Sequence, residues 1–181
     1  LDGTQQTWSV FGTDTLALGA AWHATASARV NVSTIDNRDR IDPGGGDTSL
    51  DGHHRFVRLN PAVGLTGEPR PWLNLYAGYS EGSLAATSIE LGCANPDLPC
   101  KLPNAMAGDP PLDQVVTRTL EAGARSGGRA RTQWHAGVFR ADNSNDILFI
   151  ASTASGAGYF SNVGHTRRQG VEAGVRRAVR G

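Results

Sequence analysis

The stretch WHATASARVNVSTID, residues 22–36, has the clearest periodicity in this chain. Every second side chain is apolar, whereas those between are mostly polar or charged. The apolar set is Trp22, Ala24, Ala26, Ala28, Val30 and Val32. Successive side chains of a β-strand point to opposite faces, while a helix would mix the two sets. The stretch is therefore predicted to be a strand with one apolar and one polar face.

The same alternation recurs on both sides of this stretch. It is seen at residues 57–66, 73–80, 119–124, 133–138 and 170–175, and less clearly at 8–18. Strands of this kind are recognised by their period of two and by the turn residues around them. The chain is predicted to be all-β, with about seven strands and no helix.

The connections between the strands follow a pattern of their own. Short turns are predicted near Gly19, at 67–71 and at 126–128, and long polar loops at 37–54, 81–113 and 142–163. Strands joined by short turns pair as antiparallel neighbours, which predicts a β-meander. Short turns at one end and long loops at the other are typical of outer-membrane β-barrels.

Composition limits the function classes that fit this chain. In 181 residues, 17 basic and 17 acidic side chains give a formal net charge of +0, which does not indicate a nucleic-acid partner. No run of eighteen apolar residues could form a transmembrane helix, although a barrel strand needs only about ten residues. No catalytic motif or metal-ligand set appears, so no enzyme activity and no cofactor are predicted. The chain begins Leu1-Asp2-Gly3 without a signal sequence, so it is expected to be an internal fragment.

Two hairpins resemble those of a known family. NPAVGLT at 60–66 followed by PWLNLYAGYSEG at 71–82 is similar to a hairpin of TonB-dependent outer-membrane receptors. RTLEAGAR at 118–125, AGVFRADNSNDI at 136–147 and TRRQGVE at 166–172 resemble strands that follow it in that family. The resemblance covers about residues 55–181. It departs at Leu84 and Ala86, where the family commonly has an arginine and a proline.

This resemblance implies a fold, a location and a function. The whole of residues 1–181 would be an incomplete part of a receptor β-barrel in the bacterial outer membrane, without the plug domain. About seven strands cannot close a barrel, since even the smallest need eight. The implied function is transport: energy-coupled uptake of a scarce solute such as a ferric siderophore. The implied partners are the lipid bilayer, the plug, the remaining strands and, through the plug, the TonB complex.

Several charged residues are candidates for ligand binding. His53, His54 and Arg55 end a predicted loop and could contact a metal chelate or an anion, or could simply be solvated. Other charged residues are assigned to the polar parity, meaning the alternate strand positions that carry mostly polar side chains. This parity must face the barrel lumen, because arginine on the lipid side is costly. This set is Arg29, Arg58, Arg118, Glu121, His135 and Glu172, of which Arg58, Arg118 and Glu121 are ligand-binding candidates.

The two cysteines, Cys93 and Cys100, are separated by six residues. Their spacing is too wide for a redox Cys-x-x-Cys motif, and no histidine lies nearby to complete a zinc site. A local disulfide fits best, with two free thiols as the alternative.

A second function class uses the same strand pattern. A soluble secreted β-sandwich that binds glycans or proteins would also have alternating strands and one disulfide. The two classes differ in which face is packed. A sandwich buries its apolar parity against a second sheet, whereas a barrel leaves that parity outside, in contact with lipid.

Overall fold

The structure is a computed structural model that describes residues 2–40, 43–44, 49–95, 97, 112–127, 132–151 and 157–177. Within this part of the chain it has seven strands and one short helix. The elements are β1 (Asp2–Ala17), β2 (Trp22–Arg38), β3 (Gly52–Arg70), β4 (Leu73–Leu84), α1 (Ser88–Leu91), β5 (Val115–Ser126), β6 (Thr132–Ala151) and β7 (Gly158–Arg177). None of the described helical residues belongs to a helix long and apolar enough to cross a membrane.

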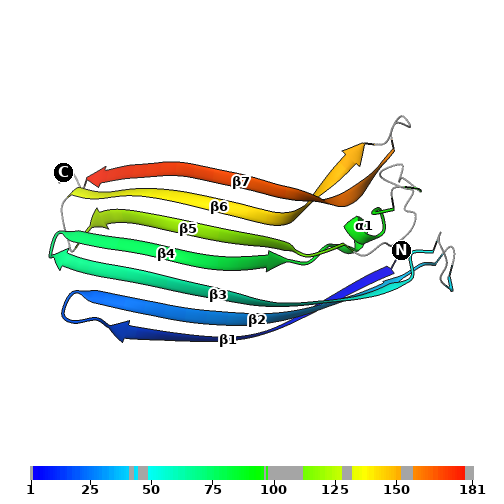
Figure 1. The fold of residues 1–181 in the computed structure, drawn as a ribbon, viewed down its shortest axis with the longest axis horizontal. Coiled ribbons are helices and arrows are strands. Elements are labelled where there is room, and N and C mark those ends of the chain that lie inside the picture. The colour runs from blue at the N-terminus through cyan, green and yellow to red at the C-terminus, as the bar shows by residue number, and fades with distance from the viewer. Residues whose placement is uncertain are drawn as a thin grey trace.

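The strands form one sheet in the order β1-β2-β3-β4-β5-β6-β7, and each pairs antiparallel with its sequence neighbours (Figure 1). The prediction of an antiparallel meander is confirmed. The connections β1–β2, β3–β4 and β5–β6 meet at one end of the sheet, called here the turn end. The other connections and α1 lie at the opposite end, called here the loop end.

The two faces of the sheet differ as the alternation predicts. Val10, Val30 and Leu59 are cross-strand partners on one face, and Val138 pairs with Val171 on the same parity. These side chains are exposed: Leu59 at 55% and Val171 at 79%. In the described part of the chain no second sheet covers them. The sandwich alternative is therefore wrong, because it requires the apolar parity to be packed inside.

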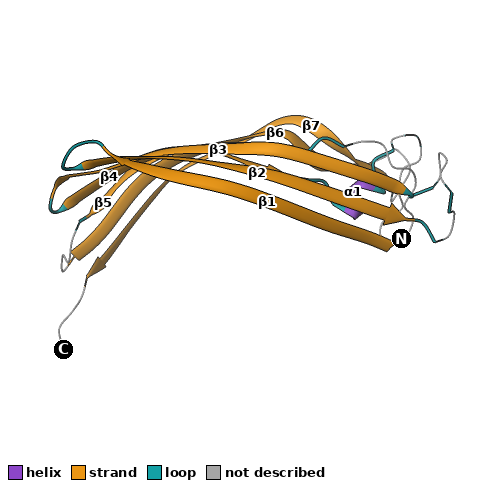
Figure 2. Ribbon diagram, turned by 90° about the horizontal axis from the view of Figure 1, so that it is seen from below, coloured by secondary structure: helices purple, strands orange, loops and turns teal. Residues whose placement is uncertain are grey.

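The sheet is strongly curved, and Figure 2 shows it as an arch with α1 beneath it. Its polar parity lines the concave side. There, hydroxyl and amide side chains bond across strands, as in Thr7–Ser33 at 2.8 Å and Thr15–Thr25 at 3.0 Å. The convex side carries the exposed apolar residues.

Two of the predicted boundaries are wrong at the loop end. β6 and β7 stay paired as far as Ala151 and Gly158, so most of the predicted loop 142–163 is strand. Residues 142–146 are polar on both faces and residues 147–151 are apolar on both faces, so neither half shows a period of two. Cross-strand bonds stabilise it instead: Thr166 Oγ1 donates to Asp146 at 2.6 Å, and Arg167 Nε donates to Asp142 at 2.6 Å.

The prediction of no helix is also wrong, by one turn. α1 begins after Thr87, whose hydroxyl accepts from the Glu90 N–H while the Glu90 carboxylate accepts from the Thr87 N–H. This capping box, Thr-x-x-Glu, was visible in the sequence.

Residues 85–95, called here the strap, cross the concave side at the loop end and carry α1. α1 contacts both β2 and β7, and the Phe160 N–H donates to the Cys93 carbonyl at 2.6 Å. The strap forms the main buried apolar cluster of the described residues, which contains Ile35, Phe56, Ala86, Leu91, Ala94, Leu112, Ile147 and Phe160. The concave parity is therefore apolar at this end and polar elsewhere.

One opening interrupts the sheet between β3 and β4. Their pairing stops at Ala62 and Ser80, although β3 continues to Gly52. The next pair would place Pro61 opposite Glu81, and proline has no N–H to donate to β4. β4 then pairs only with β5, as far as Leu84. The loop-end half of β3 thus faces a gap, whose other border is the end of β4 and the segment that leads into β5.

Candidate functional site

A cleft of about 560 Å³ lies at this gap and is called here the mouth cleft. It is formed by the first residues of β3, the segment before β5, and one residue each of β5 and β6. Its lining is His53, His54, Arg55, Phe56, Val57, Arg58, Leu112, Asp113, Gln114, Val116 and Asn145. Gln114 Nε2 donates to the Val57 carbonyl at 3.2 Å and closes part of the open β3 edge.

The histidines at the cleft have different surroundings. His53 Nδ1 lies 2.6 Å from Asp36 Oδ1, and both side chains are more than half exposed. His54 stacks on Phe56 with ring centroids 6.5 Å apart. The His54 ring is thus positioned by an aromatic neighbour.

Asp51 orders the loop that leads into β3. Its carboxylate accepts from the Asp39 N–H at 2.6 Å and from the Gly44 N–H at 2.8 Å. These two donors, with Gly44 contributing most, hold the pKa of Asp51 below its ordinary value. The carboxylate therefore stays ionised at neutral pH, just before the His53–Arg55 stretch.

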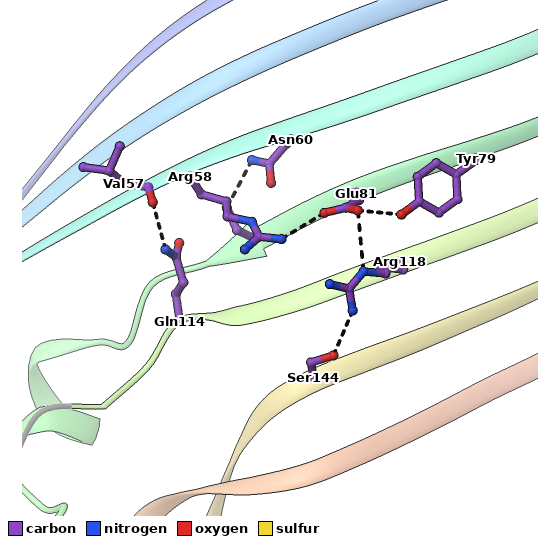
Figure 3. A network of polar contacts seen from close by, with 9 residues as sticks. Val57, Arg58, Asn60, Tyr79, Glu81, Gln114, Arg118 and Ser144 are labelled. Atoms are coloured by element: carbon purple, nitrogen blue, oxygen red, sulfur yellow. Dashed lines mark hydrogen bonds and ion pairs between the residues drawn. The ribbon is translucent and has the colours of Figure 1, made fainter.

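Glu81 joins the two borders of the gap (Figure 3). Its carboxylate accepts from Arg58 Nη2 at 2.9 Å and from the Tyr79 hydroxyl at 2.5 Å, and lies 3.5 Å from Arg118 Nε. The Glu81 side chain is only 15% exposed. This β4 carboxylate, held by two guanidinium groups and a phenol, connects β3 to the β4–β5 pair where the β3–β4 backbone ladder is missing.

The arrangement is suited to binding an anionic group. Arginine and histidine donors surround an open cleft, and such groups recognise carboxylates, phosphates or metal chelates. Among the residues that the structure describes, no group of three or more His, Cys, Asp or Glu could hold a bare metal ion.

The sequence matches the model of one protein family, "TonB dependent receptor-like, beta-barrel", over residues 2–179. The chain belongs to this family. Known members of the TonB-dependent receptor family are transporters and receptors that form β-barrels in the bacterial outer membrane. In such barrels the short turns are periplasmic and the long loops extracellular.

Solved TonB-dependent receptors have the same fold over nearly the whole chain. The copper transporter OprC superimposes with a TM-score of 0.78 at 16% identity, covering 99% of this chain and 27% of OprC. The FrpB iron transporter from Neisseria meningitidis (F3-3 variant) gives 0.71 at 13% identity, with 99% and 24% coverage. The alcaligin outer-membrane receptor FauA from Bordetella pertussis gives 0.66 at 14% identity, with 98% and 28% coverage. The chain thus spans about a quarter of each of these receptors, and no curated protein matches its sequence.

The receptor segment brings four of the predicted ligand-binding residues together. His53, His54, Arg55 and Arg58 all line the mouth cleft. Arg118 lies on β5, across the gap from β3. Its guanidinium and that of Arg58 contact the same Glu81 carboxylate. Glu121 is elsewhere: it lines a separate concave groove together with Ser27, Tyr76 and Arg125.

The parity assigned to Arg118 is wrong. The register pairs Arg118 with Glu81 and Asp142, on the convex parity that it shares with Leu120, whereas Glu121 lies on the concave parity. A charge is found on the apolar parity because this part of β5 lies beyond the apolar band, where alternation no longer separates lipid from lumen.

Sequence reasoning missed Glu81, Asp113, Gln114 and Asn145. Glu81 carried a usable signal, since it is an acidic residue two positions after Tyr79, on the parity of Leu73, Leu75 and Ala77. The other three come from segments without periodicity. Only the tertiary structure brings them to β3.

Proposed function

We propose that this chain is part of the wall of an outer-membrane TonB-dependent receptor that takes up a scarce solute, such as a ferric siderophore, in an energy-coupled manner. One observation carries this proposal: a single curved sheet has an uncovered apolar convex face and a polar concave face. Contact of the apolar face with water would be costly, and soluble monomers accordingly seldom expose patches of this extent. Lipid outside and a polar lumen inside satisfy both faces.

The proposal requires the rest of a receptor. Seven strands with open edges leave unpaired backbone groups at β1 and β7, and a closed barrel needs further strands to satisfy them. A plug inside the lumen would face the concave parity, and it would carry the contact with the TonB complex. In this assembly the chain contributes wall and ligand contacts, and it catalyses no reaction.

We propose that the mouth cleft contacts the solute. The solved relatives include a copper transporter, an iron transporter and an alcaligin receptor, and a further one, HasR, was solved with its hemophore and heme. A metal held in an anionic chelate is the ligand chemistry that best suits a cleft of arginine and histidine donors.

This proposal predicts a loss of affinity when the cleft donors are removed. In the complete receptor, His54→Gln combined with Arg55→Gln should weaken binding of the recognised chelate about ten-fold or more, because charge-assisted hydrogen bonds are lost. Binding and uptake would be measured with a panel of ferric siderophores, heme and copper salts. Arg70→Gln, at the turn end, is the control and should change neither.

The possible outcomes separate two claims. Uptake with an unchanged affinity in the double variant would contradict the role of the mouth cleft alone. A folded receptor in the outer membrane that takes up none of the probes would contradict the proposed solute class.

We also propose that Cys93 and Cys100 form a disulfide. Cys93 is 1% exposed, and the described residues contain no free cysteine; Cys100 lies outside the described residues. Closing so short a loop would stabilise the fold by roughly 2.5 kcal/mol through chain entropy.

Alkylation without reduction should leave both cysteines unlabelled, and alkylation after reduction should label both. Cys93→Ser and Cys100→Ser should each lower the free energy of unfolding by a similar amount. The double variant should show the same decrease as either single variant. Two labelled thiols before reduction would disprove the pairing.

A further inference from the structure

The convex face carries a row of charges at the edge of its apolar area. Arg118, Asp142 and Arg167 are cross-strand partners on β5, β6 and β7. Arg140 lies two residues closer to the turn end on the same face of β6, opposite Leu120 and Gln169. All of these strand positions point outward, away from the lumen.

Asp142 holds two of these arginines side by side. Its carboxylate oxygens accept from Arg140 Nε at 2.7 Å and from Arg167 Nε at 2.6 Å. Both contacts use the Nε atoms, so the Nη groups of each guanidinium remain to bind a second anion. The arginine side chains are 47% and 56% exposed. Two neighbouring, half-exposed guanidinium groups with Nη donors to spare form a clamp suited to a phosphate.

An apolar trough begins at this clamp. A groove of about 690 Å³ runs over Ala77 and Ala122, between Val63 and Leu65 on one side and Val138 on the other. The small alanine side chains leave the hollow, and the larger neighbours form its walls. Arg140 and Gln169 line the same groove. A cationic end therefore adjoins an open apolar groove of a kind that suits a hydrocarbon chain.

The depth of the clamp matches a membrane boundary. Arg140 is about eight residues from the turn end of β6, and a tilted strand crosses the hydrocarbon core in about ten. The outward residues on the turn-end side of Arg140 are Val138, Ala136 and Trp134, whereas Asp142 and Ser144 follow on the other side. The clamp thus lies where the outer-leaflet headgroups of a barrel in the outer membrane would be.

We propose that this convex site binds one phosphorylated, acylated lipid of the outer leaflet. Its phosphate is held by Arg140 and Arg167, and one acyl chain lies in the trough over Ala77 and Ala122. The inference rests on the proposed location of the receptor, but it is independent of the solute and of the mouth cleft.

The test uses the complete receptor in phosphatidylcholine nanodiscs with and without lipid A, and counts bound lipid by native mass spectrometry. Arg140→Gln combined with Arg167→Gln should reduce lipid A binding about ten-fold or more, since two charge-assisted contacts are lost. Ala122→Trp fills the trough and should also reduce binding, although it leaves both arginines in place. Arg168→Gln is the matched control, because Arg168 is adjacent on β7 but lies on the concave parity.

Each result bears on one claim. Equal loss in the Arg168 variant, or no loss in the Ala122 variant, would overturn the site. Inorganic phosphate that competes as strongly as lipid A would show a free-anion site instead of a lipid site. Membrane fractionation and heat-modifiable migration of every variant report whether a folded barrel reaches the outer membrane, which tests the proposed function separately.

Discussion

Arginine in place of Ala28 is expected to destabilise the assembled barrel by about 2–4 kcal/mol, the cost of a cation on the lipid face near the bilayer midplane. Ala28 is exposed on the convex side, between Pro61 of β3 and Gly12 of β1, neither of which offers a counter-charge. It lies between Trp22 and Val32, the two ends of the apolar alternation on β2. A side chain at this depth has no water within reach except by distorting the bilayer.

Ser27→Arg is the matched control. Ser27 is the adjacent residue on β2, but its side chain lines the concave groove that also contains Thr25, Tyr76 and Glu121. Arginine there meets polar groups and a carboxylate, so the free energy of unfolding should change by less than about 1 kcal/mol. Urea unfolding of the barrel, with the plug deleted, from phosphatidylcholine vesicles measures both variants. Equal losses in the two variants would mean that the faces are wrongly assigned, because a one-residue shift of register exchanges them.

Glu81→Gln should lower the free energy of unfolding by about 1–2 kcal/mol, a value reduced from that of a fully buried pair because Arg58 and Arg118 are partly exposed. The glutamine is almost isosteric but removes the negative charge that both arginines share. Its NH2 group is a hydrogen-bond donor and would face the guanidinium donors without an acceptor. The start of β3 should loosen, because the Arg58–Glu81 pair ties it to β4 beyond Pro61, where the β3–β4 ladder ends. Hydrogen exchange of residues 52–60 should accelerate in the same variant.

A second pair provides the comparison for Glu81. The Arg40–Asp2 ion pair is shorter, at 2.6 Å against 2.9 Å for Arg58–Glu81, but both of its side chains are more than half exposed. Arg40→Gln should therefore leave unfolding and hydrogen exchange at β3 unchanged. Combining Glu81→Gln with Arg58→Met should cost less than the sum of the single changes, because the methionine leaves no unpaired charge behind. Additive losses would show that Glu81 and Arg58 are not coupled.

Much of the fold could be predicted because strand alternation is a local property. Trp22 to Val32 shows which face is apolar without reference to any other strand, and the short turn near Gly19 specifies the antiparallel partner. The prediction failed where both faces are polar, at Asp142 to Asp146. There, hydrogen bonds to Thr166 and Arg167 make the strand, and these partners lie 20 and 25 residues away.

The candidate site was predictable only in part. His53, His54 and Arg55 stand out as adjacent donors at the end of a loop, so the sequence points to them. Glu81 and Gln114 are isolated polar residues in the sequence, and nothing local links them to β3. Their role arises because β4 leaves β3 at Pro61 and opens a gap that their side chains border.

The order of the amino acids alone specified the family, the seven-strand meander and the outward apolar face, because a period of two and short turns are encoded within each hairpin. The tertiary structure alone decided what the faces contact at the loop end. The curvature of the sheet carries β2 and β7 to the same strap, and the register aligns Arg140, Asp142 and Arg167 from two strands. Such contacts depend on the summed twist and stagger of many strand pairs, which no single stretch of sequence contains.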